Sequence, residues 1–305
     1  MIKVFIFLLL PGFLFAQNIT LVMTVDWEGK KISEKNISAI QKFRNNHPEI
    51  RMLHFLNPAY LIRPGADPEK LINQINSVLR DEDERGLHIH AWKFLVEYCG
   101  INYKASPSYA NFDESCKNGK ECGYTVSLEF AYSQKALSKL VKCSKEILIN
   151  YGFGEPKSFR AGGWQFGRKL AQALAENNFN WDSSRTDPEV LMPLWRRESN
   201  LVQMLLKLHP NASGIDQPFQ ILPGLIELPN NGNLADYTPP SRLLNLFKKN
   251  VENGGGFFVT GFHLDTADFT LPKLEKGLEL IKKYSQENNV QINWAHFPIL
   301  NYFPK

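Results

Sequence analysis

Short apolar runs alternate with amphipathic stretches along most of this chain. The apolar runs are rich in β-branched residues, which is typical of buried strands, and they lie at 19–26, 51–56, 87–92, 158–160, 180–183, 257–263 and 290–294. Helical spacing of apolar residues predicts helices at 33–46, 68–84, 133–151, 166–177, 241–253 and 272–286. Residues 219–228 are predicted to be extended and 186–216 irregular. Repeated strand–helix units predict an α/β protein with a parallel sheet, and about seven such units in one domain predict a (β/α) barrel.

The composition is that of an ordinary globular protein. The 305 residues are 43% hydrophobic and 22% charged, with a net charge of +4. Because there is no basic run of five or more residues, we expect a mixed solvated surface and no nucleic-acid partner. No break in composition marks a linker, so residues 17–305 are predicted to form one domain.

The first 16 residues have the pattern of a secretory signal peptide. Lys3 precedes an apolar run from 4 to 15, and Ala16 follows that run. The run is shorter than the ~20 apolar residues of a spanning helix, so no stable membrane span is expected after cleavage. We therefore expect an exported protein, periplasmic or secreted. Leu14 is bulky for its position before the cleavage site, which leaves a different site or a retained anchor as alternatives.

The four cysteines agree with export. Cys99, Cys116 and Cys122 lie in or beside a long polar insertion, roughly 97–127, and Cys143 follows it. Four cysteines allow three pairings. Pairing Cys116 with Cys122 would close a short polar loop and leave Cys99 with Cys143. A four-cysteine zinc site is the alternative, disfavoured because there is no C-x-x-C pair and because oxidising compartments favour disulfides.

Two short segments carry the strongest chemical signal. His88 and His90 are two residues apart on a predicted strand, so their side chains point the same way. Asp26 and Glu28 end the first predicted strand in the same fashion. Because the carboxyl ends of barrel strands meet at one rim, the two pairs are expected to meet there. Two imidazoles and a carboxylate can hold a divalent metal with an open position for water. The alternative for Asp26 and Glu28 is that both are solvated acids at the end of a surface strand. The alternative for His88 and His90 is that one lies in the core and the other on the surface.

The segments that carry these residues resemble the polysaccharide deacetylases, carbohydrate esterase family four. Five segments carry the resemblance in chain order: 24–29 (TVDWEG), 86–90 (GLHIH), 159–164 (FRAGGW), 181–184 (WDSS) and 261–265 (GFHLD). The resemblance implies a distorted (β/α) barrel of about seven strands. It also implies a divalent metal, commonly zinc, held by one carboxylate and two histidines. A metal-activated water then attacks an acetyl carbonyl on a sugar, with an Asp as base and a late-strand His as acid.

The segments contain further strand-end residues to which roles can be assigned. His263 would be the general acid, and Asp265 would orient it or raise its pKa. Arg160 would orient the base carboxylate through a charge-assisted pair, and Asp182 would join that network. The alternatives are a capping role for Asp265, a surface salt bridge for Arg160, and a turn cap with Ser183 and Ser184 for Asp182.

The sequence departs from the family pattern in two places. The family's first motif has two adjacent acids, whereas Trp27 separates Asp26 from Glu28 here. We assign Asp26 as the base and Glu28 as the metal ligand, with the reverse assignment left open. The family's second motif spaces its histidines four apart, whereas His88 and His90 are two apart. These departures bear on the class of substrate and on whether the protein keeps its metal and activity, and less on the fold.

Together with this resemblance, the site residues predict a metal-dependent hydrolase that removes acetyl groups from an N-acetylated sugar. The expected substrate is a carbohydrate, such as a cell-wall or surface polysaccharide, and the expected cofactor is a divalent metal, zinc being preferred. A metal-dependent amidase acting on another C–N substrate is one alternative. A noncatalytic carbohydrate-binding protein on the same fold is the other.

Overall fold

The structure, a computed structural model, describes residues 17–110, 122–192 and 194–303. The predicted signal peptide (1–16) and Cys116 lie outside the described residues. The described strands form one sheet in the order β6-β7-β5-β4-β3-β2-β1-β9-β8, with β10 paired to β1. Neighbouring strands are parallel except in the β6–β7 hairpin. The strands are β1 (Gln17–Asp26), β2 (Met52–Leu56), β3 (Glu84–Ile89), β4 (Ser158–Ala161), β5 (Trp181–Asp182), β6 (Phe219–Leu222), β7 (Leu225–Glu227), β8 (Asn233–Leu234), β9 (Gly256–His263) and β10 (Val290–Trp294).

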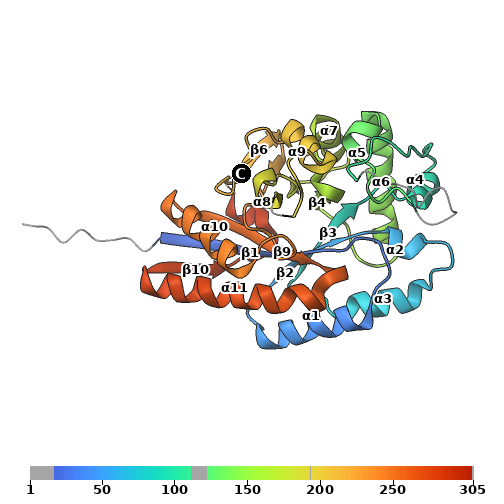
Figure 1. Cartoon of the computed structure of the whole chain (residues 1–305). Coiled ribbons are helices and arrows are strands. Elements are labelled where there is room, and N and C mark those ends of the chain that lie inside the picture. The colour runs from blue at the N-terminus through green and yellow to red at the C-terminus, as the bar shows by residue number, and fades with distance from the viewer. Residues whose placement is uncertain (1–16, 111–121, 193, 304–305) are drawn as a thin grey trace, which may run out of the picture.

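Helices pack around this curled sheet, with α1 and α11 along one side and α6, α7 and α9 on the other (Figure 1). The helices are α1 (Glu34–Asn46), α2 (Ala59–Ile62), α3 (Pro68–Asn76), α4 (Lys93–Tyr98), α5 (Leu128–Ala131), α6 (Gln134–Asn150), α7 (Arg168–Glu176), α8 (Pro188–Leu191), α9 (Asn200–Leu208), α10 (Pro240–Glu252) and α11 (Ala267–Glu287), with the 3₁₀ turns η2 (Gly162–Trp164), η3 (Leu264–Thr266) and η4 (Ile299–Tyr302). Among the described helices, none is both long and apolar enough to cross a membrane. The predicted barrel-type α/β fold is confirmed.

Strand β1 pairs with β2, β9 and β10 and places the first pair of acids. It pairs with β9 along one edge, while β10 and β2 share the other edge. Its side chains alternate between two apolar clusters: Val22 packs with Phe55 inside the sheet, and Met23 belongs to the cluster beneath the helices. Thr24 and Asp26 lie on the same face as Val22. This alternation turns Asp26 toward the interior of the curled sheet.

Two element boundaries differ from the prediction because of Asp83. The helix predicted to reach residue 84 ends at Asn76, and β3 begins at Glu84 instead of 87. The Asp83 carboxylate accepts the backbone N–H groups of Met52 and Arg80 and pairs with Arg44 at 2.9 Å. These long-range contacts hold 80–83 in a turn. At its other end β3 stops at Ile89, so His90 follows the strand, whereas it was predicted to lie in the strand.

Other boundaries are also set by tertiary contacts. Helix α11 begins at Ala267, five residues before the predicted start at Pro272, because Asn36 Oδ1 accepts the N–H of Asp268. The segment 186–216, predicted to be irregular, contains α8 and α9. The Ser199 side chain caps α9. The helical stripe of Leu201, Val202 and Leu205 is the signal that the prediction missed.

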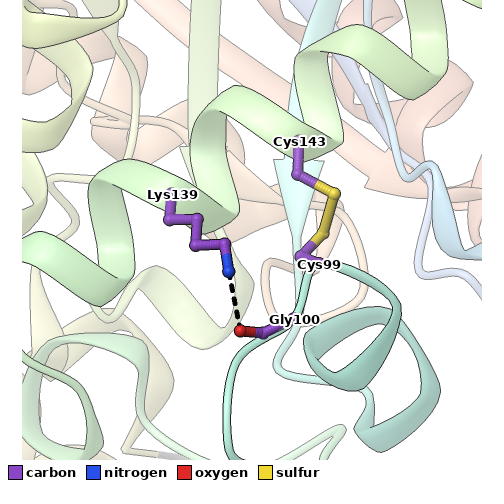
Figure 2. The surroundings of a disulfide bond; sticks show 4 residues. All are labelled: Cys99, Gly100, Lys139 and Cys143. Carbon is purple, nitrogen blue, oxygen red and sulfur yellow. Dashed lines mark hydrogen bonds between the residues drawn. A yellow bond between two sulfur atoms is a disulfide. The ribbon is translucent and has the colours of Figure 1, made fainter.

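A disulfide joins Cys99, at the end of α4, to Cys143 in α6 (Figure 2). The two Cα atoms are 5.7 Å apart, which is ordinary for a disulfide. Beside it, the Lys139 ammonium donates to the Gly100 carbonyl at 2.7 Å. Cys122 is also disulfide-bonded. The Cys99–Cys143 pairing is confirmed, and it ties the insertion to the body of the protein.

Candidate active site

Three histidine side chains, two from β3 and the residue after it and one from β9, meet around Glu28, just after the end of β1. His90 Nε2 lies 2.7 Å from Glu28 Oε2. His88 Nε2 and His263 Nε2 lie 3.7 and 3.2 Å from Glu28 Oε1. The side chains of Glu28, His88 and His90 are at most 3% exposed. The two pairs that the sequence predicted to meet at one rim therefore lie together.

The hydrogen bonds of the two histidines determine which nitrogen carries the proton. His88 Nδ1 lies 2.8 Å from the Arg160 carbonyl, and His90 Nδ1 lies 2.7 Å from the Tyr124 carbonyl. A carbonyl oxygen only accepts, so both Nδ1 atoms carry hydrogen. In the neutral imidazole, which is the form that binds a metal, each Nε2 atom then presents a lone pair. Gly162 allows this arrangement, because a Cβ there would lie 2.5 Å from His90 Nδ1.

Three acceptor atoms therefore converge without a hydrogen-bond donor between them among the described residues. His88 Nε2, His90 Nε2 and Glu28 Oε2 are buried and have no hydrogen-bond partner among the residues that the structure describes. Ligand atoms of these three side chains lie within 4.8 Å of one another. Buried lone pairs facing a carboxylate are costly unless a cation lies between them. Two imidazoles and a carboxylate are a donor set that zinc takes in open sites, so the residues fit a divalent metal.

Contacts on the backbone and the side chain hold Glu28 ionised and in place. The Trp92 indole donates to the Glu28 carbonyl at 3.0 Å. The next residue, Gly29, has φ of 78°, where a side chain would be strained. Burial by itself would raise the pKa of Glu28, but the neighbouring His90 and His263 side chains hold that pKa well below its ordinary value. Burial lowers the pKa of His90, which favours the neutral form that a metal ligand requires.

Arg160 holds Asp26 from inside the sheet. Its guanidinium is fully buried and donates to Asp26 Oδ1 at 2.8 Å and to Thr24 Oγ1 at 2.9 Å. It also donates to the carbonyl and hydroxyl oxygens of Ser183. The predicted contact between Arg160 and Asp26 is present, and it is a buried pair instead of the surface salt bridge that was the alternative. Because Oδ1 already accepts from Arg160, Asp26 is less suited than Glu28 to be the ligand.

Asp182 caps the turn at Ser183 and Ser184, which was the alternative to a contact with Arg160. It accepts hydrogen bonds from the backbone and the hydroxyl of Ser184, both at 2.8 Å. It also shares a hydrogen bond with buried Glu227. Burial raises the pKa of Asp182 to about 6, and burial together with Asp182 raises the pKa of Glu227 well above its ordinary value. Asp182 therefore supports the loop that Arg160 binds and does not itself bind Arg160.

This buried acid pair predicts a pH-dependent gain in stability for Glu227→Gln. When the pKa of an acid is higher in the folded state than in the unfolded state, ionisation of that acid destabilises the folded state. Its contribution to stability is fully present below the unfolded-state pKa and is lost as the pH rises through the folded-state pKa. We expect Glu227→Gln to increase the free energy of unfolding by on the order of 1 kcal/mol at pH 8 and to change it little at pH 4. Urea unfolding at the two pH values measures this, with the exposed Glu189→Gln as control. An equal change at both pH values would contradict the assignment.

The partner of His263 is Asp236 and not the predicted Asp265. His263 Nδ1 lies 3.1 Å from Asp236 Oδ2, and Thr266 donates to the other oxygen of Asp236. Burial would lower the pKa of His263, but Asp236 and Glu28 raise it to about 10. Asp265 instead lies 3.6 Å from Lys30. Asp236 comes from the loop after β8, 27 residues before His263, and no local pattern in the sequence indicates it.

A small cavity of about 90 Å³ lies over these groups. Its polar lining is Asp26, Glu28, His88, His90 and His263. Most of the remaining wall is aromatic or apolar and includes Tyr109, Tyr124, Trp164, Trp195, Leu201 and Tyr237. Trp27 and Trp92, whose sequence positions also adjoin the motifs, are buried and pack in the core. The three tyrosines come from loops without periodicity, so no pattern in the sequence indicates them.

No protein-family model matches this sequence, and no curated protein matches it at a significant level. Solved structures of similar fold do exist. A Mycobacterium smegmatis protein described as a candidate polysaccharide deacetylase has a TM-score of 0.52 at 12% identity, over 93% of this chain and 89% of that one. PuuE allantoinase has a TM-score of 0.50 at 11% identity, over 94% and 89%. A family 4 carbohydrate esterase from Streptomyces lividans has a TM-score of 0.42 at 11% identity, over 93% and 94%. The predicted resemblance to the polysaccharide deacetylases is confirmed in the fold.

Proposed function

We propose that this protein is a metal-dependent hydrolase that removes acetyl groups from an N-acetylated sugar or polysaccharide. One observation carries the proposal: the lone pairs of His88 Nε2, His90 Nε2 and Glu28 Oε2 converge in a buried site without hydrogen-bond partners among the described residues. A divalent metal bound there, with zinc preferred for this donor set, would supply Lewis-acid chemistry to a water molecule and to the acyl oxygen.

The protein's own residues supply the proton transfers. Asp26, oriented by Arg160, accepts a proton from the attacking water as the new C–O bond forms. His263, protonated and held by Asp236, donates a proton to the departing nitrogen as the C–N bond breaks. The products are acetate and the free amine. Asp26 and His263 both line the cavity over Glu28, so base and acid face the same small space.

Two further features support an extracytoplasmic carbohydrate substrate. The Cys99–Cys143 disulfide is typical of oxidising compartments, which supports export of the protein. Aromatic walls suit the apolar faces of sugar rings. The similar fold of PuuE allantoinase also makes hydrolysis of another C–N bond a second candidate function.

The test is metal content together with acetate release. Purified mature protein loaded with zinc is expected to hold about one metal per chain and to release acetate from N-acetylglucosamine or its oligomers. A chelator should abolish this release and added zinc should restore it. Bound metal without acetate from any acetylated sugar would favour the second candidate. A protein that binds no metal would contradict the hydrolase and leave a carbohydrate-binding role.

Asp236→Asn is expected to shift the alkaline limb of the pH profile. Protonated His263 is the active acid, so kcat/KM should fall as the pH rises through its pKa. Loss of the Asp236 charge lowers that pKa, so we expect the alkaline fall to move down by about 1–3 pH units. Kinetics from pH 6 to 10 measure this, with Asp268→Asn as control because Asp268 pairs with the exposed Lys35. An unmoved alkaline limb would show that Asp236 does not tune the acid.

A further inference from the structure

The wall of the cavity is built from segments that lie far apart in the chain. Tyr109 and Tyr124 come from the insertion between α4 and α5, and Trp164 follows β4. Trp195 comes from the α8–α9 segment, and Tyr237 follows β8. These segments converge over the buried acids and histidines.

Direct contacts hold these segments together. Tyr109, Trp164 and Leu201 belong to one apolar cluster, separate from the main core, and are 6%, 4% and 2% exposed. Asn200 of α9 donates to the Ser108 carbonyl of the insertion at 3.2 Å. The wall is therefore packed and hydrogen-bonded, as an ordered part of the fold would be.

The backbone around Trp164 is also constrained. Trp164 has φ of 56°, a conformation rarely adopted by a bulky residue and often found at functional sites. His209 Nε2 binds its carbonyl at 3.0 Å. The Tyr237 ring lies edge-on to both Trp164 and His263, at 5.5 and 5.9 Å between centroids. Tyr237 therefore joins the aromatic wall directly to the proposed acid.

The size of the cavity limits what can reach the site. Pockets for small ligands are usually about 300–1,000 Å³, whereas this cavity measures about 90 Å³. Glu28, His88 and His90 line the cavity and are at most 2% exposed. The bond to be cut must therefore enter the cavity, with room for the acyl group and a small part of the sugar. A unit inside a polymer carries chain on both sides and would collide with the wall.

We propose, resting on the function proposed above, that the protein deacetylates a free N-acetyl sugar or the terminal unit of a chain, and not units in the chain interior. The mainly aromatic wall formed by Tyr109, Trp164, Trp195, Tyr237 and the apolar Leu201 selects for a chain end. The acyl methyl and one face of the terminal ring contact apolar surface, while the rest of the chain stays outside the cavity.

The test is the position of the amine in the product. The zinc-loaded protein is incubated with a pentamer of N-acetylglucosamine, and tandem mass spectrometry locates the deacetylated unit. We expect deacetylation at one end of the oligomer and release of acetate from the monomer. Deacetylation of interior units at comparable rates would overturn this inference while supporting the proposed function. No acetate from monomer or pentamer would contradict the proposed function, and this inference with it.

Removing part of the wall should change the position of the reaction. Trp195→Ala is expected to increase the ratio of interior to terminal deacetylation by at least about tenfold. Leu194→Ala is the matched control, since Leu194 is the neighbouring residue, is 65% exposed and does not line the cavity. Leu201→Ala removes apolar volume from the same wall and serves as a second variant. If both wall variants fold, by circular dichroism, and keep the wild-type product pattern, the wall does not select chain ends.

Discussion

Replacing His88 and His90 together by alanine is expected to remove the bound metal and nearly all activity. The metal content should fall from about one per chain to near zero, because only the Glu28 carboxylate of the three converging groups would remain. Loss of the metal's several kcal/mol of charge stabilisation corresponds to a fall in kcat/KM on the order of 10³-fold or more. Elemental analysis and acetate release measure the two effects separately.

The matched control for this variant is His296→Ala. His296 is exposed and contacts Arg51, away from the cavity lining. This variant should keep both metal and activity. A double variant that still binds one metal per chain would show that the metal site lies elsewhere. A folded double variant that loses the metal but keeps full activity would contradict the proposed chemistry.

Replacing Asp26 by asparagine is expected to separate the base from the metal site. Asparagine has nearly the same shape and can still accept from Arg160, but it cannot take a proton from water. We expect kcat to fall by about 10²–10⁴-fold. We also expect the metal content to be unchanged, because Asp26 Oδ1 is bound by Arg160 and the ligand set is Glu28 with His88 and His90.

Glu28→Gln is the variant to compare with Asp26→Asn. It is expected to lose the metal, because Glu28 is the proposed carboxylate ligand. If Asp26→Asn loses the metal and Glu28→Gln keeps it, the two roles are reversed. This reversal is physically meaningful because Asp26, Glu28 and His263 also form a group of converging ligand atoms. Asp81→Asn serves as control, because Asp81 is exposed and lies outside the cavity lining.

The strand register explains why so much of the site was visible in the sequence. Asp26 pairs with His263 across β1 and β9, and His88 pairs with Arg160 across β3 and β4. Parallel strands in a barrel end at one rim, so residues at strand ends gather without any knowledge of loops. Alternation along β1 likewise predicted that Asp26 and Glu28 share a side.

Residues that reach the site from loops were beyond this reasoning. Asp236 and Tyr237 follow β8, a strand of two residues that contains no apolar run from which it could be predicted. Tyr109 and Tyr124 come from an insertion whose path depends on the Cys99–Cys143 disulfide and on packing against α9. These loops have no periodicity, so their contacts depend on the folded surroundings.

The sequence by itself determined the alternation of strands and helices, the barrel class and the gathering of Asp26, Glu28, His88, His90 and His263, because periodicity and strand-end position are local properties. The tertiary structure alone decided three things. It made Asp236 the partner of His263 in place of Asp265, it placed Asp182 in the turn beneath Arg160, and it closed the aromatic wall over the site. Each of these depends on which distant backbone atoms and side chains come within hydrogen-bond or van der Waals distance, and the order of residues along one segment does not specify that.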